Sequence, residues 1–81
     1  MSYVVVFITT PSKEEAEKIS DYLVKNHLVA CVNIVEKVNS IFFWQGKVEN
    51  SQESLMIVKT KKEMFKKVAE EVKKMHTYTV P

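Results

Sequence analysis

One cysteine and two histidines are the side chains of this sequence best suited to binding a metal. Cys31 lies within an apolar stretch, while His27 and His76 each follow a stretch with helical periodicity. A cysteine thiolate binds copper and other soft cations, and neutral imidazole binds most transition metals. The spacing of the three residues matches no compact metal motif. A site built from them therefore needs ligands from distant parts of the chain or from other subunits.

These three residues also fit ordinary structural roles. Cys31 stands between Ala30 and Val32, where a thiol packs as a small buried hydrophobe, and this is the interpretation we favour for it. His27 is expected to pair with the C-terminal dipole of the helix that it follows. His76 fits the same capping role after the second helix, or a place in a ligand set, and both interpretations stay open.

Two further polar residues have a packing and a binding interpretation. Lys59 ends an apolar strand segment, where its ammonium extends to solvent or pairs with Glu53 or a bound anion. Tyr78 offers a ring for packing or a hydroxyl for a polar cleft. Neither alternative is decided by the sequence.

Trp44 follows two phenylalanines, Phe42 and Phe43, at the end of a long apolar stretch. Successive side chains of a strand point to opposite faces, so three adjacent aromatic rings cannot all enter one small core. The rings either form a satellite cluster or belong to a subunit interface, where aromatic residues are enriched. We favour the interface, because the predicted hairpin is long for one small domain.

The composition excludes several classes of function. The chain has 81 residues, of which 46% are hydrophobic and 27% charged, as in one small globular domain. All 12 basic residues are lysine and the net charge is +2, which argues against nucleic acid as a partner. The single glycine, Gly46, excludes glycine-rich phosphate loops. No nucleophile–base pair or carboxylate dyad is evident, so an enzyme is the least favoured class.

No apolar run approaches the roughly 20 residues that a membrane-spanning helix requires, so no membrane is expected as a partner. The N-terminus has neither the basic residues nor the cleavage site of a signal peptide. A cytoplasmic location is the default expectation.

The elements that must position these residues follow from periodicity. Ser12 and Glu15 form a Ser-x-x-Glu capping box, and Thr60 and Glu63 repeat that pattern. The repeat predicts that each apolar strand is followed by an amphipathic helix. We expect a central strand buried on both faces, a helix, a long hairpin bulged near Val38–Ser40, a second helix and the start of another strand: residues 3–9, 12–26, 29–44 with 47–60, 61–75 and 78–81.

This order predicts an α+β fold of the ferredoxin-like, split βαβ type, in a single domain over residues 1–81. Its antiparallel sheet carries both helices on one face, and right-handed crossovers place the first strand beside the third. The fourth strand is only begun before Pro81. We therefore expect this chain to be a truncated form of a longer protein, since the apolar first strand needs a neighbour on both edges.

The sequence resembles the CutA divalent-cation tolerance family over nearly its whole length. The resemblance rests on four sets of residues, namely Leu28-Val29-Ala30-Cys31-Val32-Asn33-Ile34, Ser40 with Trp44-Gln45-Gly46-Lys47, Glu53 with Lys59-Thr60, and His76-Thr77-Tyr78-Thr79-Val80-Pro81. Thr10-Pro11 and Ala16 fit the family's first loop and helix. Thr77 departs from the family, which often has proline there. Family chains also continue past the Val-Pro pair with a fourth strand and a C-terminal helix.

The resemblance implies a homotrimer with hairpins that pair between subunits, and a link to divalent-cation tolerance with copper as the first candidate. It implies clefts between subunits that are lined by six residues, namely Cys31, Trp44, Glu53, Lys59, His76 and Tyr78. Of these, we expect Cys31 and His76 to be the metal ligands. It also implies no established catalysis. The alternative is a trimeric small-ligand or signalling module similar to the PII proteins, which binds an anion or metabolite between subunits.

Overall fold

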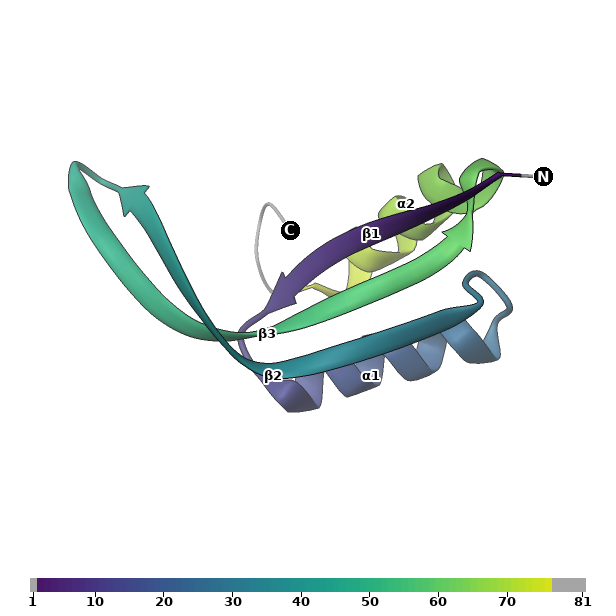
Figure 1. The fold of residues 1–81 in the computed structure, drawn as a ribbon, viewed down its shortest axis with the longest axis horizontal. Coiled ribbons are helices and arrows are strands. Elements are labelled where there is room, and N and C mark those ends of the chain that lie inside the picture. The colour runs from purple at the N-terminus through teal and green to yellow at the C-terminus, as the bar shows by residue number, and fades with distance from the viewer. Residues whose placement is uncertain (1, 77–81) are drawn as a thin grey trace.

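Three antiparallel strands and two helices make up residues 2–76, the part of the chain that the computed structural model describes (Figure 1). The strand order is β1-β3-β2, so the first strand lies beside the third, as predicted. This arrangement confirms the α+β class and is compatible with the ferredoxin-like plan. The predicted segment from Tyr78 lies outside the described residues. In chain order the elements are β1 (Tyr3–Thr10), α1 (Lys13–Lys25), β2 (Cys31–Trp44), β3 (Lys47–Lys61), the 3-10 turn η1 (Lys62–Met64) and α2 (Phe65–Met75).

Helix α1 has the predicted boundaries at both ends. The Ser12 hydroxyl accepts a 3.1 Å hydrogen bond from the backbone N–H of Glu15, which confirms Ser12 as the N-cap. The helix ends where His27 takes a positive φ of 57° and its N–H donates to the Val24 carbonyl. Such a left-handed residue satisfies carbonyls that the helix leaves open. His27 therefore ends the helix through its backbone.

The second predicted capping box is wrong. Strand β3 runs on to Lys61, and α2 begins after η1 with Met64 at its N-cap, which makes no side-chain capping bond. The Thr60 hydroxyl donates instead to the Leu28 carbonyl at 2.8 Å. Thr60 is buried, so this bond satisfies a hydroxyl that would otherwise be costly to bury.

The hairpin of β2 and β3 is long and irregular at one point. Its register shifts between Val35 and Val38, slightly before the predicted bulge. The Ser54 hydroxyl donates to the Glu36 carbonyl inside this bulge, at 3.0 Å. Beyond it, the hairpin arm (residues 40–51) extends away from the rest of the sheet, and the molecule reaches 42 Å in its longest dimension (Figure 1). Bulges bend strands and increase their twist, which accounts for the change of direction.

The hydrophobic core lies between one face of the sheet and both helices, as predicted. Ile8, Met56 and Val58 supply the sheet side of this core. Helix α1 contributes Ala16, Ile19 and Leu23, and helix α2 contributes Val68 and Val72. Neither helix of the described residues has the length and apolar character needed to cross a membrane.

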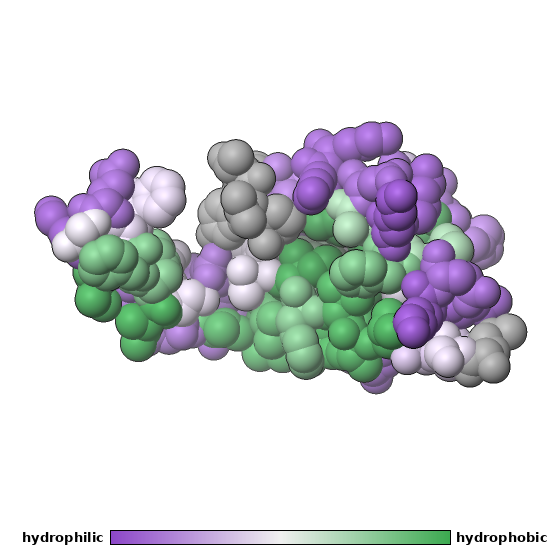
Figure 2. All heavy atoms as spheres, turned by 90° about the horizontal axis from the view of Figure 1, so that it is seen from above, coloured by the Kyte–Doolittle hydropathy of each residue, from purple (hydrophilic) through white to green (hydrophobic). Residues whose placement is uncertain are grey.

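The other face of the sheet carries no helix, and we call it the open face. It consists of Val5 and Phe7 from β1, Leu55, Ile57 and Lys59 from β3, and Cys31, Asn33 and Val35 from β2. Phe7 is 67% exposed there. The expectation that the first strand is buried on both faces is therefore wrong for the described single chain. Its neighbour in this sheet is β3, and its outward side chains form part of an apolar surface (Figure 2).

Candidate functional site

Cys31 and Lys59 lie directly opposite each other on β2 and β3, on the open face of the sheet. Val5 faces Lys59 from β1, so the three residues form one row across the strands. Side chains in such positions have Cβ atoms about 4.5–5.5 Å apart. The Cys31 thiol also lies 3.8 Å from Oδ1 of Asn33, to which it donates. The row thus places a soft metal ligand beside a cation on an otherwise apolar surface.

Glu53 is not within reach of this row in the same chain. It precedes Lys59 by six residues along β3, which corresponds to about 20 Å in a strand. Lys59 and Glu53 therefore do not pair within one chain. The sequence had left this pairing open as one of the alternatives for Lys59. Glu53 is buried where β3 bends, opposite Val38 and just past the bulge.

Trp44 lies still farther from Cys31, because the two residues are the first and last of β2. It sits at the tip of the hairpin arm, opposite Lys47, and is 62% exposed. A cleft that contains both Trp44 and Cys31 must therefore bring two copies of the chain together.

His76 ends α2 and is held against the sheet. Its backbone N–H donates to the Val72 carbonyl at 2.8 Å, and its ring Nε2 lies 2.7 Å from the Thr9 carbonyl. A carbonyl only accepts, so the bond places a proton on Nε2 and leaves Nδ1 as the ring atom that is able to ligate a metal while the bond is made. The ring is buried, with His76 only 8% exposed. This supports a structural role, and it limits any metal role to Nδ1.

The contact between His76 and Thr9 lies at the opposite end of the sheet body from Cys31. Thr9 faces Leu55, which is four residues and about 13 Å along β3 from Lys59, the residue that faces Cys31. Within residues 2–76, no three His, Cys, Asp or Glu side chains are grouped so that they would hold a metal ion. Tyr78 lies outside the described residues. One chain thus brings Cys31 and Lys59 together and separates them from Glu53, Trp44 and His76.

A polar cluster between the two helices was missed by the sequence interpretation. The Tyr22 hydroxyl donates a 2.6 Å hydrogen bond to Oε1 of Glu71, and Lys74 binds Oε2 of the same carboxylate at 3.0 Å. Lys67 lies 3.8 Å from that oxygen. Glu71 falls between Val68 and Val72, the two buried valines of α2. A carboxylate beside the apolar stripe of a helix is the signal in the sequence that points to such a cluster.

The cluster shifts the pKa of three of its members. The hydrogen bond from Tyr22, followed by that from Lys74, lowers the pKa of Glu71. The same carboxylate raises the pKa of Tyr22 and that of Lys74, in each case chiefly through the hydrogen bond to Glu71. These shifts favour the ionised carboxylate, and the cluster joins α1 to α2.

Comparison with known proteins points to one family. The family described as CutA1 divalent ion tolerance protein matches residues 4–81. The chain is 51% identical over 76 residues to the divalent-cation tolerance protein CutA of Archaeoglobus fulgidus, covering 94% of this chain and 74% of that protein. It is 52% identical over 77 residues to the CutA of Thermus thermophilus, covering 95% of this chain and 75% of that protein.

Solved structures agree with the sequence comparison. The structure described as the periplasmic divalent cation tolerance protein CutA of Archaeoglobus fulgidus superposes with a TM-score of 0.94 at 49% identity, over 98% of this chain and 76% of that one. CutA1 of Oryza sativa superposes with a TM-score of 0.96 at 38% identity, over 98% and 72%. A rice relative is named as chloroplastic and the Archaeoglobus fulgidus structure is described as periplasmic, so the cytoplasmic location stays a prediction. The chain belongs to the CutA1 family of divalent ion tolerance proteins.

Proposed function

We propose that the protein is a homotrimer that binds copper or another soft transition metal in clefts between its subunits. The observation that carries this proposal is the separation of the candidate ligands. Cys31 stands on an exposed apolar face, whereas His76 and Trp44 lie far from it in the same chain. Contact between copies is the arrangement that would bring these residues together.

The apolar surface of a single chain supports the trimer. Phe7 and Val5 on the open face, and Ile41, Phe43 and Trp44 on the hairpin arm, are all exposed. Contiguous apolar surface of this kind typically marks a protein–protein interface. We propose that the open faces and hairpin arms of neighbouring subunits cover each other.

The available donors suit a soft cation. A thiolate from Cys31 and Nδ1 of His76 are ligands that copper(I) accepts, whereas Mg²⁺ and Ca²⁺ prefer oxygen. The Cys31 thiol must lose its proton before it binds the metal, so metal affinity should fall as the pH is lowered. Family membership supports the link to divalent cations without naming the metal.

A copper(I) titration against a competing chromophoric chelator tests this site. Replacing Cys31 by Ser should weaken binding by at least about tenfold, because oxygen is a poor ligand for this soft ion. Val35→Ser is the matched control, since it adds a hydroxyl to the same exposed face and keeps the thiol. His76→Gln keeps a donor for the Thr9 carbonyl and removes the imidazole, so it isolates ligation from packing. Unchanged affinity in Cys31→Ser would leave Cys31 as a packing residue only.

A second candidate function is supported by Lys59. Its ammonium group lies in the row with Cys31 and Val5 on an apolar face, where a bound anion would offset its desolvation. We propose the alternative that a small anionic metabolite occupies the inter-subunit cleft beside Lys59. Calorimetric titration with a panel of carboxylates and phosphates tests it, with Lys59→Gln as the variant that should lose binding. Retained binding in Lys59→Gln would contradict this alternative.

A further inference from the structure

The hairpin arm (residues 40–51) joins the rest of the sheet at the bulge in β2. Two residues of β2, Glu36 and Lys37, occupy the place of one residue of β3, Ser54, because the register shifts there. A bulge interrupts the ladder of backbone hydrogen bonds and bends the strand. The ladder therefore does not fix the direction of the arm at this point, and other contacts are needed to fix it.

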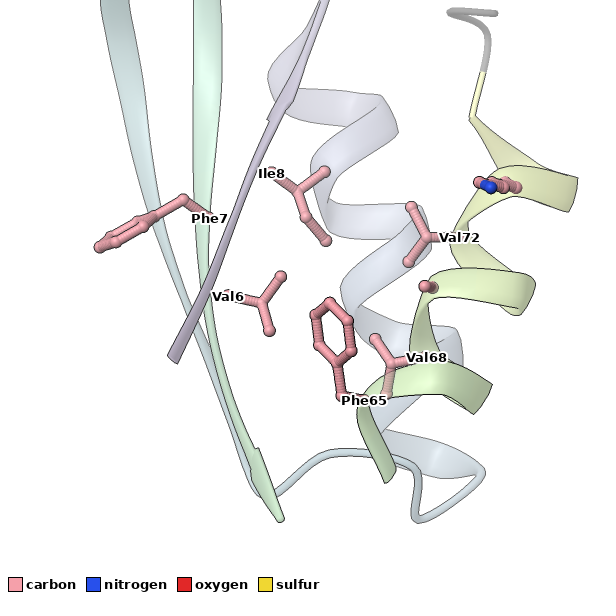
Figure 3. A pocket seen from close by; sticks show the side chains of 8 residues that line it. Val6, Phe7, Ile8, Phe65, Val68 and Val72 are labelled. Atoms are coloured by element: carbon pink, nitrogen blue, oxygen red, sulfur yellow. The ribbon is translucent and has the colours of Figure 1, made fainter. Parts of the chain in front are cut away.

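The sheet body, in which β1 pairs with β3, is held by packing. Val6 and Ile8 of β1 point toward α2, whereas Phe7 points to the opposite face of the sheet (Figure 3). β1 pairs with β3 as far as Thr10, which lies opposite Ser54. Toward the tip of the arm from there, the described part of β3 has β2 as its one strand neighbour. A two-stranded hairpin without further support is only marginally stable. The direction of the arm therefore depends on the contacts at its base.

Ser54 holds the bulge from the inside. It is buried, and its hydroxyl donates a 3.0 Å hydrogen bond to the Glu36 carbonyl. Thr10, which lies opposite Ser54 on β1, is also buried, and its hydroxyl donates to the Ser12 carbonyl at 2.8 Å. Ser12 is the N-cap of α1. Hydrogen bonds and strand pairing thus connect the bulge with the start of α1.

Lys13 and Glu36 make the same connection from the outside. Nζ of Lys13 lies 2.8 Å from Oε1 of Glu36, and both side chains are about half exposed. Lys13 is the first residue of α1, where the helix dipole disfavours a cation, and the ion pair with Glu36 offsets that cost. An exposed ion pair contributes little to overall stability. Its effect lies in where it acts, which is the base of a long arm.

We propose that Lys13, Glu36 and Ser54 form a latch that fixes the direction of the hairpin arm relative to the sheet body. Ser54 holds the backbone of the bulge, and Lys13 ties the bulge to α1 through the Glu36 carboxylate. Ionic strength controls the second contact, because salt screens an exposed ion pair. When that contact opens, the tip of the arm with Trp44 moves most, since it lies farthest from the bulge (Figure 1). The latch acts within one chain and is independent of the metal site.

Pulsed electron paramagnetic resonance tests the latch by measuring the distance between two spin labels. The labels are attached through Asp21→Cys, an exposed residue of α1, and Lys47→Cys, which lies opposite Trp44 at the tip of the arm. Cys31→Ser removes the one native thiol. The labelled chain is refolded with a large excess of unlabelled chain, so that every measured distance lies within one chain whether or not chains associate.

Charge variants test the exposed half of the latch. Glu36→Lys places two cations together and should widen the distance distribution at least about 1.5-fold, because like charges repel. The exchange of Lys13→Glu with Glu36→Lys should restore the native width, since it rebuilds the pair with the signs reversed. Lys37→Gln is the matched control and should leave the width unchanged, because Lys37 lies in the same bulge outside the ion pair.

Salt should act in opposite directions on the native pair and on Glu36→Lys. Raising the salt concentration from about 0.1 M to about 1 M shortens the Debye length from about 10 Å to about 3 Å. The distribution of the native pair should widen because its attraction is screened, whereas that of Glu36→Lys should narrow because its repulsion is screened. A role of these side chains in packing alone would show no such opposite response.

Ser54→Ala tests the buried half of the latch. It removes the hydrogen bond to the Glu36 carbonyl and should widen the distribution while the ion pair stays intact. Ser51→Ala is the control, since Ser51 lies on the same strand within the arm, opposite Ser40, and it should leave the width unchanged. Circular dichroism establishes that each variant is folded.

An unchanged distribution in either Glu36→Lys or Ser54→Ala would overturn the proposal, because strand pairing or a neighbouring chain would then hold the arm without the latch. Equal widening in the controls Lys37→Gln or Ser51→Ala would overturn it as well. So would a charge exchange that leaves the distribution as wide as in Glu36→Lys alone, or a salt response of the same sign in both proteins.

Discussion

Tyr22 and Glu71 are joined by a 2.6 Å hydrogen bond between residues that lie 49 positions apart in the sequence. The bond links α1 to α2 beside the core. With Lys74, it satisfies both oxygens of a carboxylate whose side chain is only 11% exposed. The two helices are therefore held together by a specific polar contact as well as by apolar packing.

Replacing Tyr22 by Phe should destabilise the fold, because Glu71 loses its hydroxyl donor while it stays mostly buried. Urea denaturation at fixed protein concentration should show a lower midpoint with an unchanged slope. The same replacement in a Glu71→Gln background should cost less, since the charge-assisted bond is already lost. Equal losses in both backgrounds would mean that the Tyr22 hydroxyl stabilises the fold by some means other than its bond to the charged carboxylate of Glu71.

Acid should remove the contribution of Glu71. Its pKa in the folded protein lies below the usual value of 4.5, so the unfolded chain binds more protons in that range. The stabilisation is complete above about pH 5 and is lost as the pH falls through the lowered pKa. The stability difference between the native chain and Glu71→Gln, measured from pH 7 to pH 3, should shrink accordingly. Lys13 also lowers the pKa of Glu36. Glu36 is present in both proteins, so its contribution to the pH dependence cancels in the stability difference. A constant difference would contradict the assignment.

Thr60 should contribute to stability through the hydrogen bond from its hydroxyl to the Leu28 carbonyl and not through helix capping. Thr60→Val removes its bond to the Leu28 carbonyl and should cost about 1–2 kcal/mol, since the hydroxyl is buried. Glu63→Gln should change the free energy of unfolding by less than about 0.5 kcal/mol, because Glu63 belongs to no capping box in the fold. A large loss in Glu63→Gln would restore the capping interpretation.

Leu23 should be among the most costly core positions. Its side chain is fully buried between α1 and the sheet, and Leu23→Ala should cost about 2–5 kcal/mol by leaving a cavity. Val24→Ala is the matched control on the same helix, because Val24 is exposed, and it should change stability by less than about 1 kcal/mol. Similar losses in both variants would contradict the position of the core.

Local sequence patterns predicted the elements well because their causes are local. Apolar periodicity located both helices, and Ser12 with Glu15 fixed the start of α1. The repeat at Thr60 and Glu63 failed because a partner distant in sequence, the Leu28 carbonyl, takes the Thr60 hydroxyl. A pattern of four neighbouring residues carries no information about a hydrogen-bond acceptor elsewhere in the chain, such as the Leu28 carbonyl.

The candidate site was less predictable because it depends on register and on distant contacts. Cys31 lies opposite Lys59 because of the register in which β2 pairs with β3. That register depends on a bulge whose position the sequence predicted only approximately. The bond from His76 to Thr9 and that from Tyr22 to Glu71 each join residues in different elements. Family resemblance supplied Trp44 and Glu53 as candidates, and the fold of one chain places both of them far from Cys31.

The mass of the protein in solution tests the central proposal most directly. Light scattering after size exclusion should give about 28 kDa, three times the chain mass of 9.4 kDa, because the open face and the hairpin arm require cover. Copper-free protein should give the same mass, since the proposed interface consists of apolar contacts and not of metal ligation. A monodisperse species near 9.4 kDa would contradict the account, because Cys31, His76 and Trp44 would then never meet.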